Sequence, residues 1–293
     1  MATAHILVGA GEQSKAPIIR HITRADLLDA LKLGLDDFTA MPSHAVFLCV
    51  IYPLLGLLLV SITLGDAMMP LAFPLVAGFA LIGPLAAIGL YELSRRREAG
   101  LDTALSRAFD VFRSPSLGAI VALGVLLMVI FLVWLAVAEA IYVANFGYRE
   151  PASVQQFAKD VIGTAAGWRM IIEGVGIGFL FAVVVLAISA VSFPLLLDRD
   201  VGAAVAALTS VRAIAANPFA MALWGLIVAV LLVIGSLPFF LGLTVVMPLL
   251  GHATWHLYRK IVEPDPQSQA VSRPPSRSHR SAADFPAALF PSR

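Results

Sequence analysis

Long apolar runs broken by short charged segments constrain this chain more than any other feature of its sequence. No Asp, Glu, Lys or Arg occurs between Phe219 and Tyr258, and one helix of that length would be roughly twice as long as a hydrocarbon core of about 30 Å requires. Gly235 to Pro238 offers a break near the middle, which predicts a tight hairpin of two membrane-spanning helices. The chain of 293 residues is 59% hydrophobic and 13% charged, whereas soluble domains average about 45–50% and about 25%. The sequence therefore predicts a protein that crosses a membrane several times.

Six stretches are apolar and long enough to cross a bilayer, so we expect an all-α membrane bundle of six transmembrane helices. Prolines inside these stretches are expected to kink the helices, because neighbouring helices can satisfy the carbonyl groups that a proline leaves free. The spans are expected at about residues 45–64, 69–93, 117–143, 171–197, 219–235 and 238–258. Residues 145–170, between the third and fourth spans, read as the one sizeable polar loop.

Three amphipathic segments, at residues 22–41, 101–113 and 200–216, precede the first, third and fifth spans. In the first segment Thr23 is a candidate N-cap, and Asp26 follows three residues later as in a capping box. We expect these segments to lie in the membrane interface or to plug the bundle from one side. Their expected apolar faces are Leu27, Leu28, Leu31, Leu35 and Phe38; Leu101, Leu105, Ala108, Phe109 and Phe112; and Val201, Val205, Leu208, Val211 and Ala215.

A threefold internal repeat organises the chain. Each amphipathic segment is followed by a proline, and the second span of each pair contains another proline followed by leucine; these are Pro42, Pro115 and Pro218, and Pro84, Pro194 and Pro248. We therefore expect three pseudo-repeated hairpins, each preceded by a cytoplasmic amphipathic helix. The membrane domain is expected at residues 22–262, between a flexible segment at 1–21 and a disordered Pro-, Ser- and Arg-rich tail at 263–293.

The distribution of basic residues predicts the orientation. Of the 20 Lys and Arg residues, only Arg149, Lys159 and Arg169 fall on the side opposite the N-terminus in the six-span arrangement. By the positive-inside rule, both termini are expected in the cytoplasm. A net charge of +1 gives no indication of nucleic-acid binding, and the single cysteine, Cys49, excludes an intramolecular disulfide.

The last span carries the most chemically versatile stretch, because His252 and His256 lie four residues apart on one helical face. In the repeat, His252 corresponds to Asp198 and His256 to Glu92, so the four side chains form a candidate polar or metal cluster at one membrane face. Histidine also ligates haem. The alternative is interfacial packing of the histidines, with Glu92 and Asp198 paired to nearby arginines.

Two further groups are candidates for function. Glu139 is the one acid well inside an apolar run, and is either a proton or cation site or an acid that reaches the interface; Glu173 could be its neighbour. Arg95, Arg96 and Arg97 could bind anionic lipid headgroups, although the positive-inside rule explains them equally well. No hydrolase, phosphate-binding or dinucleotide-binding motif occurs in a supporting context.

Several motifs together resemble a bacterial integral-membrane family. They are Asp37-Phe38, the run from Phe79 through Gly83-Pro84 to Tyr91-Glu92 and Arg97, and the stretch from Gly251 to Tyr258 with its two histidines. In combination they are similar to the family catalogued as domain of unknown function 2189, over about residues 22–262. The resemblance implies a multi-pass protein of the bacterial inner membrane, and it carries over no catalytic residue because no activity is assigned to the family.

Three classes of function fit the sequence. We favour a structural or accessory membrane protein that binds lipid, a membrane partner or a second copy of itself, because charge within the spans is scarce. A small permease or channel fits the repeat and the kinked spans, but it would need a polar pathway beyond Glu139. A metal- or haem-dependent activity at His252 and His256 is the third class. No other cofactor is expected, and the sequence favours a non-enzymatic role without deciding the question.

Overall fold

The computed structural model describes residues 17–42, 44, 49–64, 69–79, 83–148 and 151–264. These residues form helices joined by turns and irregular segments, with one isolated β-bridge between Ile19 and Val262. Residues up to Glu263 form one compact unit, and a second unit begins at Pro264. The helices in chain order are α2 (Arg24–Ala40), α4 (Ile51–Leu64), the 3₁₀ helix η1 (Met69–Leu71), α5 (Ala72–Phe79), α6 (Gly83–Ala86), α7 (Ile88–Glu98), the 3₁₀ helix η3 (Leu105–Arg113), α8 (Leu117–Phe146), α9 (Val154–Gly163), α10 (Ala165–Ser189), α11 (Ser192–Asp198), α12 (Ala203–Ala216), α13 (Pro218–Ser236) and α14 (Leu243–Ile261).

Four helical stretches in the described part of the chain are long and apolar enough to cross a membrane. They are Ala72–Glu98, Leu117–Phe146, Ala165–Asp198 and Pro218–Ser236, which correspond to the expected second to fifth spans. The prediction of six spans is therefore met in part. The first expected span is described only as the 14-residue α4, and residues 45–48 lie outside the described residues. The last corresponds to α14, whose second half holds two histidines, an arginine and a lysine and is too polar to qualify.

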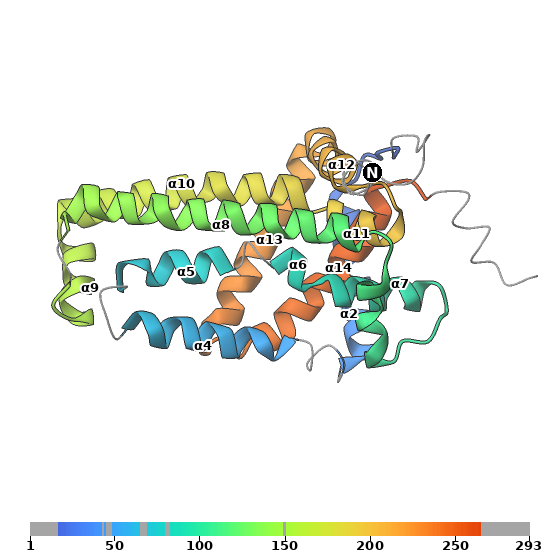
Figure 1. Ribbon diagram of the computed structural model, residues 1–293, viewed down its shortest axis with the longest axis horizontal. Helices are drawn as coiled ribbons and strands as arrows, with labels where there is room; N and C mark the ends of the chain where they lie inside the picture. Colours follow the sequence, from blue (N-terminus) through green and yellow to red (C-terminus); the bar gives the residue numbers. More distant parts are fainter. Residues whose placement is uncertain are drawn as a thin grey trace, which may run out of the picture. The chain divides into compact units, whose positions relative to one another are not determined.

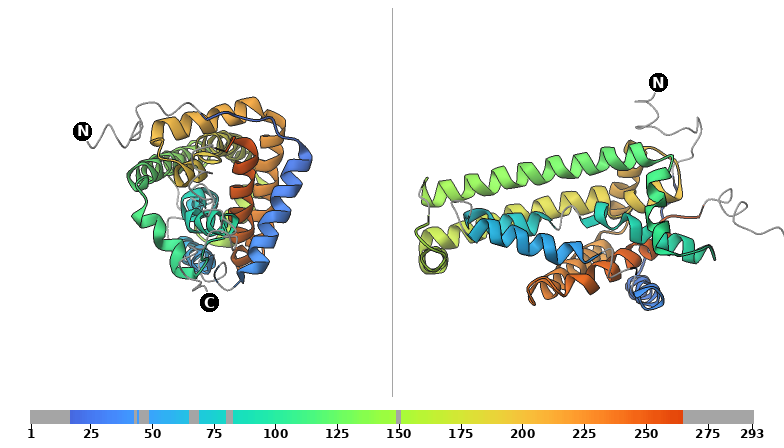
Figure 2. Two further views of the ribbon diagram at one scale, coloured as in Figure 1. Left: turned by 90° about the vertical axis from the view of Figure 1, so that its right-hand side faces the viewer. Right: turned by 60° about the horizontal axis from the view of Figure 1, so that its bottom comes forward.

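The long helices lie along one direction and several shorter ones lie across it at one end. Figure 1 shows α8 and α10 side by side, with α9 at one end of the pair and α7, α11 and α12 at the other. We call these the α9 end and the network end. In the end-on view of Figure 2, α2 and α12 are seen lengthwise while α8 and α10 are seen down their axes. Two of the three expected interfacial helices, α2 and α12, therefore run transverse to the longest helices at the network end.

Apolar side chains are exposed along the long helices, as expected of surfaces that face lipid tails. Examples on α8 and α10 are Val125, Leu132, Phe179 and Leu180, which are all more than half exposed. The buried core instead lies mainly where α2, α7, α11, α12 and α14 meet, and it includes Trp224, Trp255 and Tyr258. A soluble protein would bury the first set, so this distribution supports a membrane location.

Local sequence signals explain where several helices begin. The expected capping box at α2 is confirmed, because the Thr23 side chain accepts from the Asp26 backbone N–H and the Asp26 carboxylate accepts from the Thr23 backbone. Ser153 and Thr164 cap α9 and α10 in the same manner. The expected polar loop at 145–170 is thus wrong in part, since it contains α9 and the start of α10.

The ends of the compact unit are paired with each other. Residues next to the Ile19–Val262 bridge exchange backbone hydrogen bonds, from Arg20 N to Ile261 O and from Glu263 N to Ile18 O. The Asn217 side chain, between α12 and α13, accepts from the Ile22 backbone N–H and donates to the Arg20 carbonyl. Residues 18–21 are thus part of the fold, although the sequence suggested a flexible segment as far as residue 21. Residues 1–16 and 265–293 lie outside the described residues.

Candidate functional site

Three helices bring the candidate site together at the network end: α2, α7 and the second half of α14. The helices α2 and α14 cross closely at Gly34, where an added Cβ would lie 2.6 Å from the Ala253 backbone nitrogen. On another side of α14, a Cβ at Gly251 would lie 2.6 Å from a Leu90 methyl carbon of α7. Small residues at these two positions let three backbones approach closely enough for short polar side chains to meet.

Asp37 of α2 is the centre of the site and is only 2% exposed. Its Oδ2 accepts a hydrogen bond from Ser94 Oγ at 2.5 Å and lies 2.8 Å from His256 Nε2, while its Oδ1 pairs with the Arg97 guanidinium. Burial by itself would raise the pKa of Asp37, but hydrogen bonds from His256, Ser94 and Arg97 outweigh it and hold the pKa below its ordinary value. Asp37 is therefore an ionised, internally paired carboxylate.

His252 extends this chain of hydrogen bonds. It is completely buried, and its Nδ1 lies 2.7 Å from Ser94 Oγ. Because the single Ser94 hydroxyl proton is directed at Asp37, Nδ1 of His252 must carry a proton and donate it to Ser94. The Nε2 atom of His252 then faces the interior, where the described residues offer it no hydrogen-bond partner. We call Asp37, Ser94, Arg97, His252 and His256 the Asp37 network.

The other two members of the expected cluster lie in separate ion-pair groups. Glu92 is 3% exposed and pairs with Arg95 through two hydrogen bonds of 2.7 and 2.8 Å, with Arg96 3.6 Å away. Asp198 accepts from the Tyr258 hydroxyl at 2.6 Å and lies 3.4 Å from Arg199. The structure thus brings the two histidines together through Asp37 and Ser94, and it pairs Glu92 and Asp198 with arginines, as the alternative interpretation expected.

This arrangement bears on the metal hypothesis. Within the described residues, no group of three or more His, Cys, Asp and Glu side chains is placed to hold a metal ion. His256 Nε2 faces the Asp37 carboxylate and His252 Nδ1 faces the Ser94 hydroxyl, so the two histidines are connected through Ser94 and Asp37. A metal or haem at His252 and His256 stays a prediction, and the present geometry offers it no ready ligand set.

The three consecutive arginines are engaged within the protein. Arg95 pairs with Glu92 and Arg97 with Asp37. Arg96 donates to the Asp102 carbonyl at 2.6 Å and lies 3.4 Å from the Asp110 carboxylate. Their predicted role as lipid headgroup ligands is untested, but each guanidinium already has at least one protein partner.

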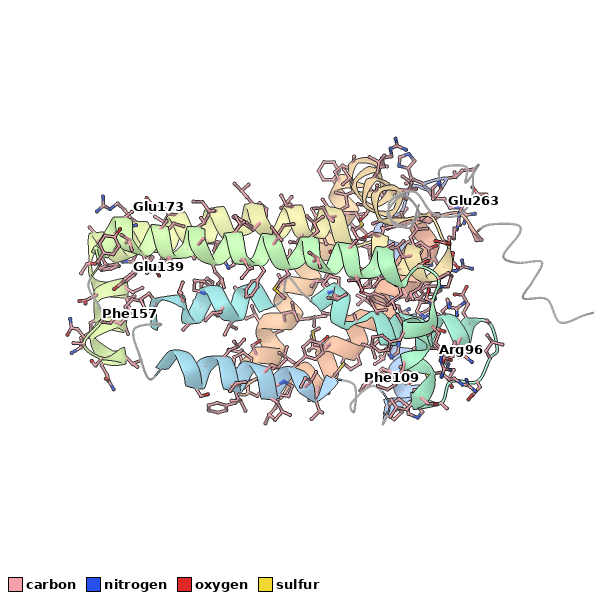
Figure 3. The ribbon with its side chains drawn as sticks, viewed as in Figure 1. Arg96, Phe109, Glu139, Phe157, Glu173 and Glu263 are labelled. Carbon is pink, nitrogen blue, oxygen red and sulfur yellow. The ribbon has the colours of Figure 1, made fainter. Side chains whose placement is uncertain are left out.

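The expected acidic pair lies at the opposite end of the bundle. Figure 3 places Glu139 and Glu173 near Phe157 at the α9 end, whereas Arg96 and Phe109 lie at the network end. Glu173 accepts a hydrogen bond from Asn145 at 2.8 Å, and both acids are exposed. A proton or cation site at Glu139 stays a prediction.

Two central residues of the Asp37 network, Asp37 and Ser94, were missed as site residues from the sequence. The available signal was the spacing of Leu27, Ala30, Gly34 and Asp37, which places a carboxylate on the same helical stripe as three small or apolar residues. Within the predicted apolar face of this helix, Leu27 is buried, whereas Leu28 and Leu35 are 59% and 49% exposed.

Comparison with known families places this site in context. Residues 72–198 match the model of DUF2189, described as a predicted integral membrane protein. The chain is similar to this family over these residues. The matched region runs from α5 to α11. It contains Ser94, Glu92, Asp198 and the three arginines, whereas Asp37 and both histidines lie outside it. Searches of curated proteins and of solved structures found no match.

Proposed function

We propose that this protein is a structural or accessory component of a bacterial inner membrane, which binds lipid through the transverse helices at its network end. The observation that carries the proposal is the absence of a charged residue from the middle of all four candidate spans. In Ala72–Glu98 every charged residue lies in the last seven positions, and Pro218–Ser236 has none. A charge inside the membrane usually marks a substrate or ion pathway, so the distribution favours a role other than transport.

The hydroxyl groups in these spans support the same conclusion. Ser189, Ser192 and Ser236 each donate to a backbone carbonyl four residues earlier in their own helix. The proton of each of these hydroxyl groups is therefore already donated within the protein. The fourth serine of the spans, Ser94, belongs to the Asp37 network.

The proposal includes a six-span topology with both termini in the cytoplasm. The described α4 and α14 would complete the first and third hairpins, so that α2, η3 and α12 each precede one pair of spans. The positions of two prolines support the repeat: the helix breaks between α10 and α11 shortly before Pro194, and Pro248 lies inside α14. The network end holds all the arginines of the ion-pair groups described above, and the positive-inside rule then assigns this end to the cytoplasm.

Reconstitution tests the choice between a structural protein and a permease. Purified full-length protein is placed in liposomes, and proton and monovalent-cation flux are followed by entrapped indicator dyes under an imposed gradient. We expect flux equal to that of protein-free liposomes, with an established channel as the positive control. Protein-dependent flux that is abolished by Glu139→Gln would replace the proposal with the permease alternative.

Metal analysis tests the remaining alternative. The proposal expects no stoichiometric metal or haem in protein purified without chelators, measured by elemental analysis and by an absorbance scan. One bound metal per chain that is lost in both His252→Ala and His256→Ala would instead support a metal-dependent activity at these histidines.

A further inference from the structure

The helix η3 presents three distinct ridges because a 3₁₀ helix has three residues per turn, so that side chains three apart are eclipsed. Ala108 and Val111 form the inner ridge and are buried. Phe109 and Phe112 form the second ridge and are 49% and 68% exposed. Arg107, Asp110 and Arg113 form the third. An aromatic ridge and a cationic ridge thus lie next to each other on one short helix.

The two phenylalanines form a pre-organised apolar surface. Their rings stack with centroids 6.5 Å apart and an interplanar angle of 11°. They also line a shallow hollow of about 470 Å³ together with Ser106, Arg107, Asp110 and Arg113. Two exposed aromatic rings have a cost in water that contact with lipid would remove.

The position of η3 favours the bilayer over water or a soluble partner as the occupant. Only three residues separate Arg113 from the first residue of α8 at Leu117, and α8 is a candidate span. The exposed apolar side chains Val121 and Val125 follow within the first turns of that span. The aromatic pair therefore lies at the height where the network end meets the membrane boundary, which is where aromatic side chains are enriched.

The charges beside the aromatic pair favour an anionic headgroup. Arg96, Arg107 and Arg113 all approach the Asp110 carboxylate, at 3.4, 3.5 and 3.7 Å. Arg107 also pairs with Asp102, and Arg96 shares Glu92 with Arg95. Four arginines thus share three carboxylates, and the excess positive charge resides on Arg113, whose side chain is 85% exposed and makes only the longest of these contacts.

We propose that η3 is a binding site for anionic phospholipid, in which Arg113 pairs with the headgroup phosphate and Phe109 and Phe112 contact the upper acyl chains. This differs from the site expected at Arg95, Arg96 and Arg97, which are paired with protein carboxylates. The inference rests on the proposed function in one respect, namely that the network end lies at a membrane surface. It goes further in naming the headgroup class and the residues.

The test measures lipid selectivity in the full-length chain. Protein in mild detergent is titrated with phosphatidylglycerol or with phosphatidylcholine of the same acyl chains, and bound lipid is counted by native mass spectrometry. Arg113→Gln should lower the preference for phosphatidylglycerol about fivefold, because one arginine near an anionic surface contributes about 1 kcal/mol. Arg113→Lys should retain most of the preference. Arg169→Gln, which replaces an exposed arginine near the start of α10, should retain all of it.

A second variant separates the aromatic contribution from the ionic one. Phe109→Ser with Phe112→Ser should reduce retention of both lipids and leave their ratio unchanged. An equal preference in Arg113→Gln and wild type, with both proteins folded by circular dichroism, would overturn the lipid site. The flux assay is independent of this result, so failure of the lipid site would not by itself indicate a transporter.

Discussion

Replacement of Asp37 by Asn is the sharpest test of the Asp37 network. The substitution preserves the shape of the side chain, but it removes the charge that Ser94, His256 and Arg97 all address. Two of these contacts come from groups that are buried or nearly so, and a hydrogen bond to a charged group contributes about 1.5–3 kcal/mol. Arg97 is 42% exposed, so its ion pair is screened and adds little. Asn still offers one acceptor. We therefore expect the free energy of unfolding to fall by about 3 kcal/mol, which is at the lower end of the range for a broken buried ion pair.

Thermal unfolding of the full-length protein in detergent measures this loss. For a chain of this size a loss of 3 kcal/mol corresponds to a decrease in Tm of about 6–12 °C. Asp36→Asn is the matched control, because it makes the same chemical change at an exposed neighbouring position of α2. If Asp37→Asn and Asp36→Asn unfold at the same temperature, the network does not hold α2 against α14, and the reasoning fails.

The pH dependence of the protein's stability provides a second test of the role of Asp37. The pKa of Asp37 is lowered from its ordinary value of 3.8, so its contribution to stability is complete above that value and is lost as the pH falls through the lower folded-state pKa. Wild-type protein should therefore lose stability below about pH 4. Asp37→Asn should show a weaker decline over the same interval. Parallel declines would contradict the assignment of this titration to Asp37.

Three further changes probe the packing around the network end and the spans. Gly34→Val should separate α2 from α14, because the new side chain meets the Ala253 backbone. Gly174→Ala is its control and should be neutral or stabilising, because nothing lies within 4 Å of the added Cβ. Thermal unfolding compares the stability of the two variants. Asn217→Ala should release the segment around Ile22 and increase its hydrogen–deuterium exchange, since two hydrogen bonds are lost; unchanged exchange would show that the bridge at Ile19 suffices. Trp134→Phe removes the buried bond from Nε1 to the Pro74 carbonyl, 3.0 Å long, and should cost about 1–2 kcal/mol of stability.

The spans were the most predictable part of the fold. Hydropathy alone located the helices that the structure places at 117–146, 165–198 and 218–236, with ends within a few residues except at the start of the second. The break before Leu243 also followed from Gly235 and Pro238. A long apolar run permits few alternatives, because a backbone in lipid must satisfy its own hydrogen bonds and only a helix does so within one segment.

The prediction of the four-residue cluster was less successful. The repeat predicts the position of each residue along the helix axis, but it does not predict which side of the helix the side chain is on. It related His252 to Asp198 and His256 to Glu92 by position in the sequence. Each acid, however, has an arginine within four residues along its own helix or just after it. A local ion pair forms without any tertiary rearrangement, so the acids were satisfied locally and the histidines found a carboxylate on another helix.

The face of α2 that packs on the protein could have been recognised only by a different rule from the one used. Apolar residues were expected to form one stripe of α2, which includes Leu28 and Leu35, and both of these side chains are exposed. At a membrane surface the exposed side can also be apolar, because lipid tails are as apolar as leucine. Hydrophobicity then no longer distinguishes the lipid-facing side of the helix from the protein-facing side, whereas residue size does. Ala30 and Gly34 on α2 are buried, Gly34 lies against Ala253 on α14, and Gly251 lies against Leu90. A stripe of small residues that ends in a single acid, as at Asp37, therefore indicates a helix contact with a buried polar centre. By the same argument, the exposed leucines of α2 face the lipid boundary, on the same end of the protein as Phe109 and Phe112.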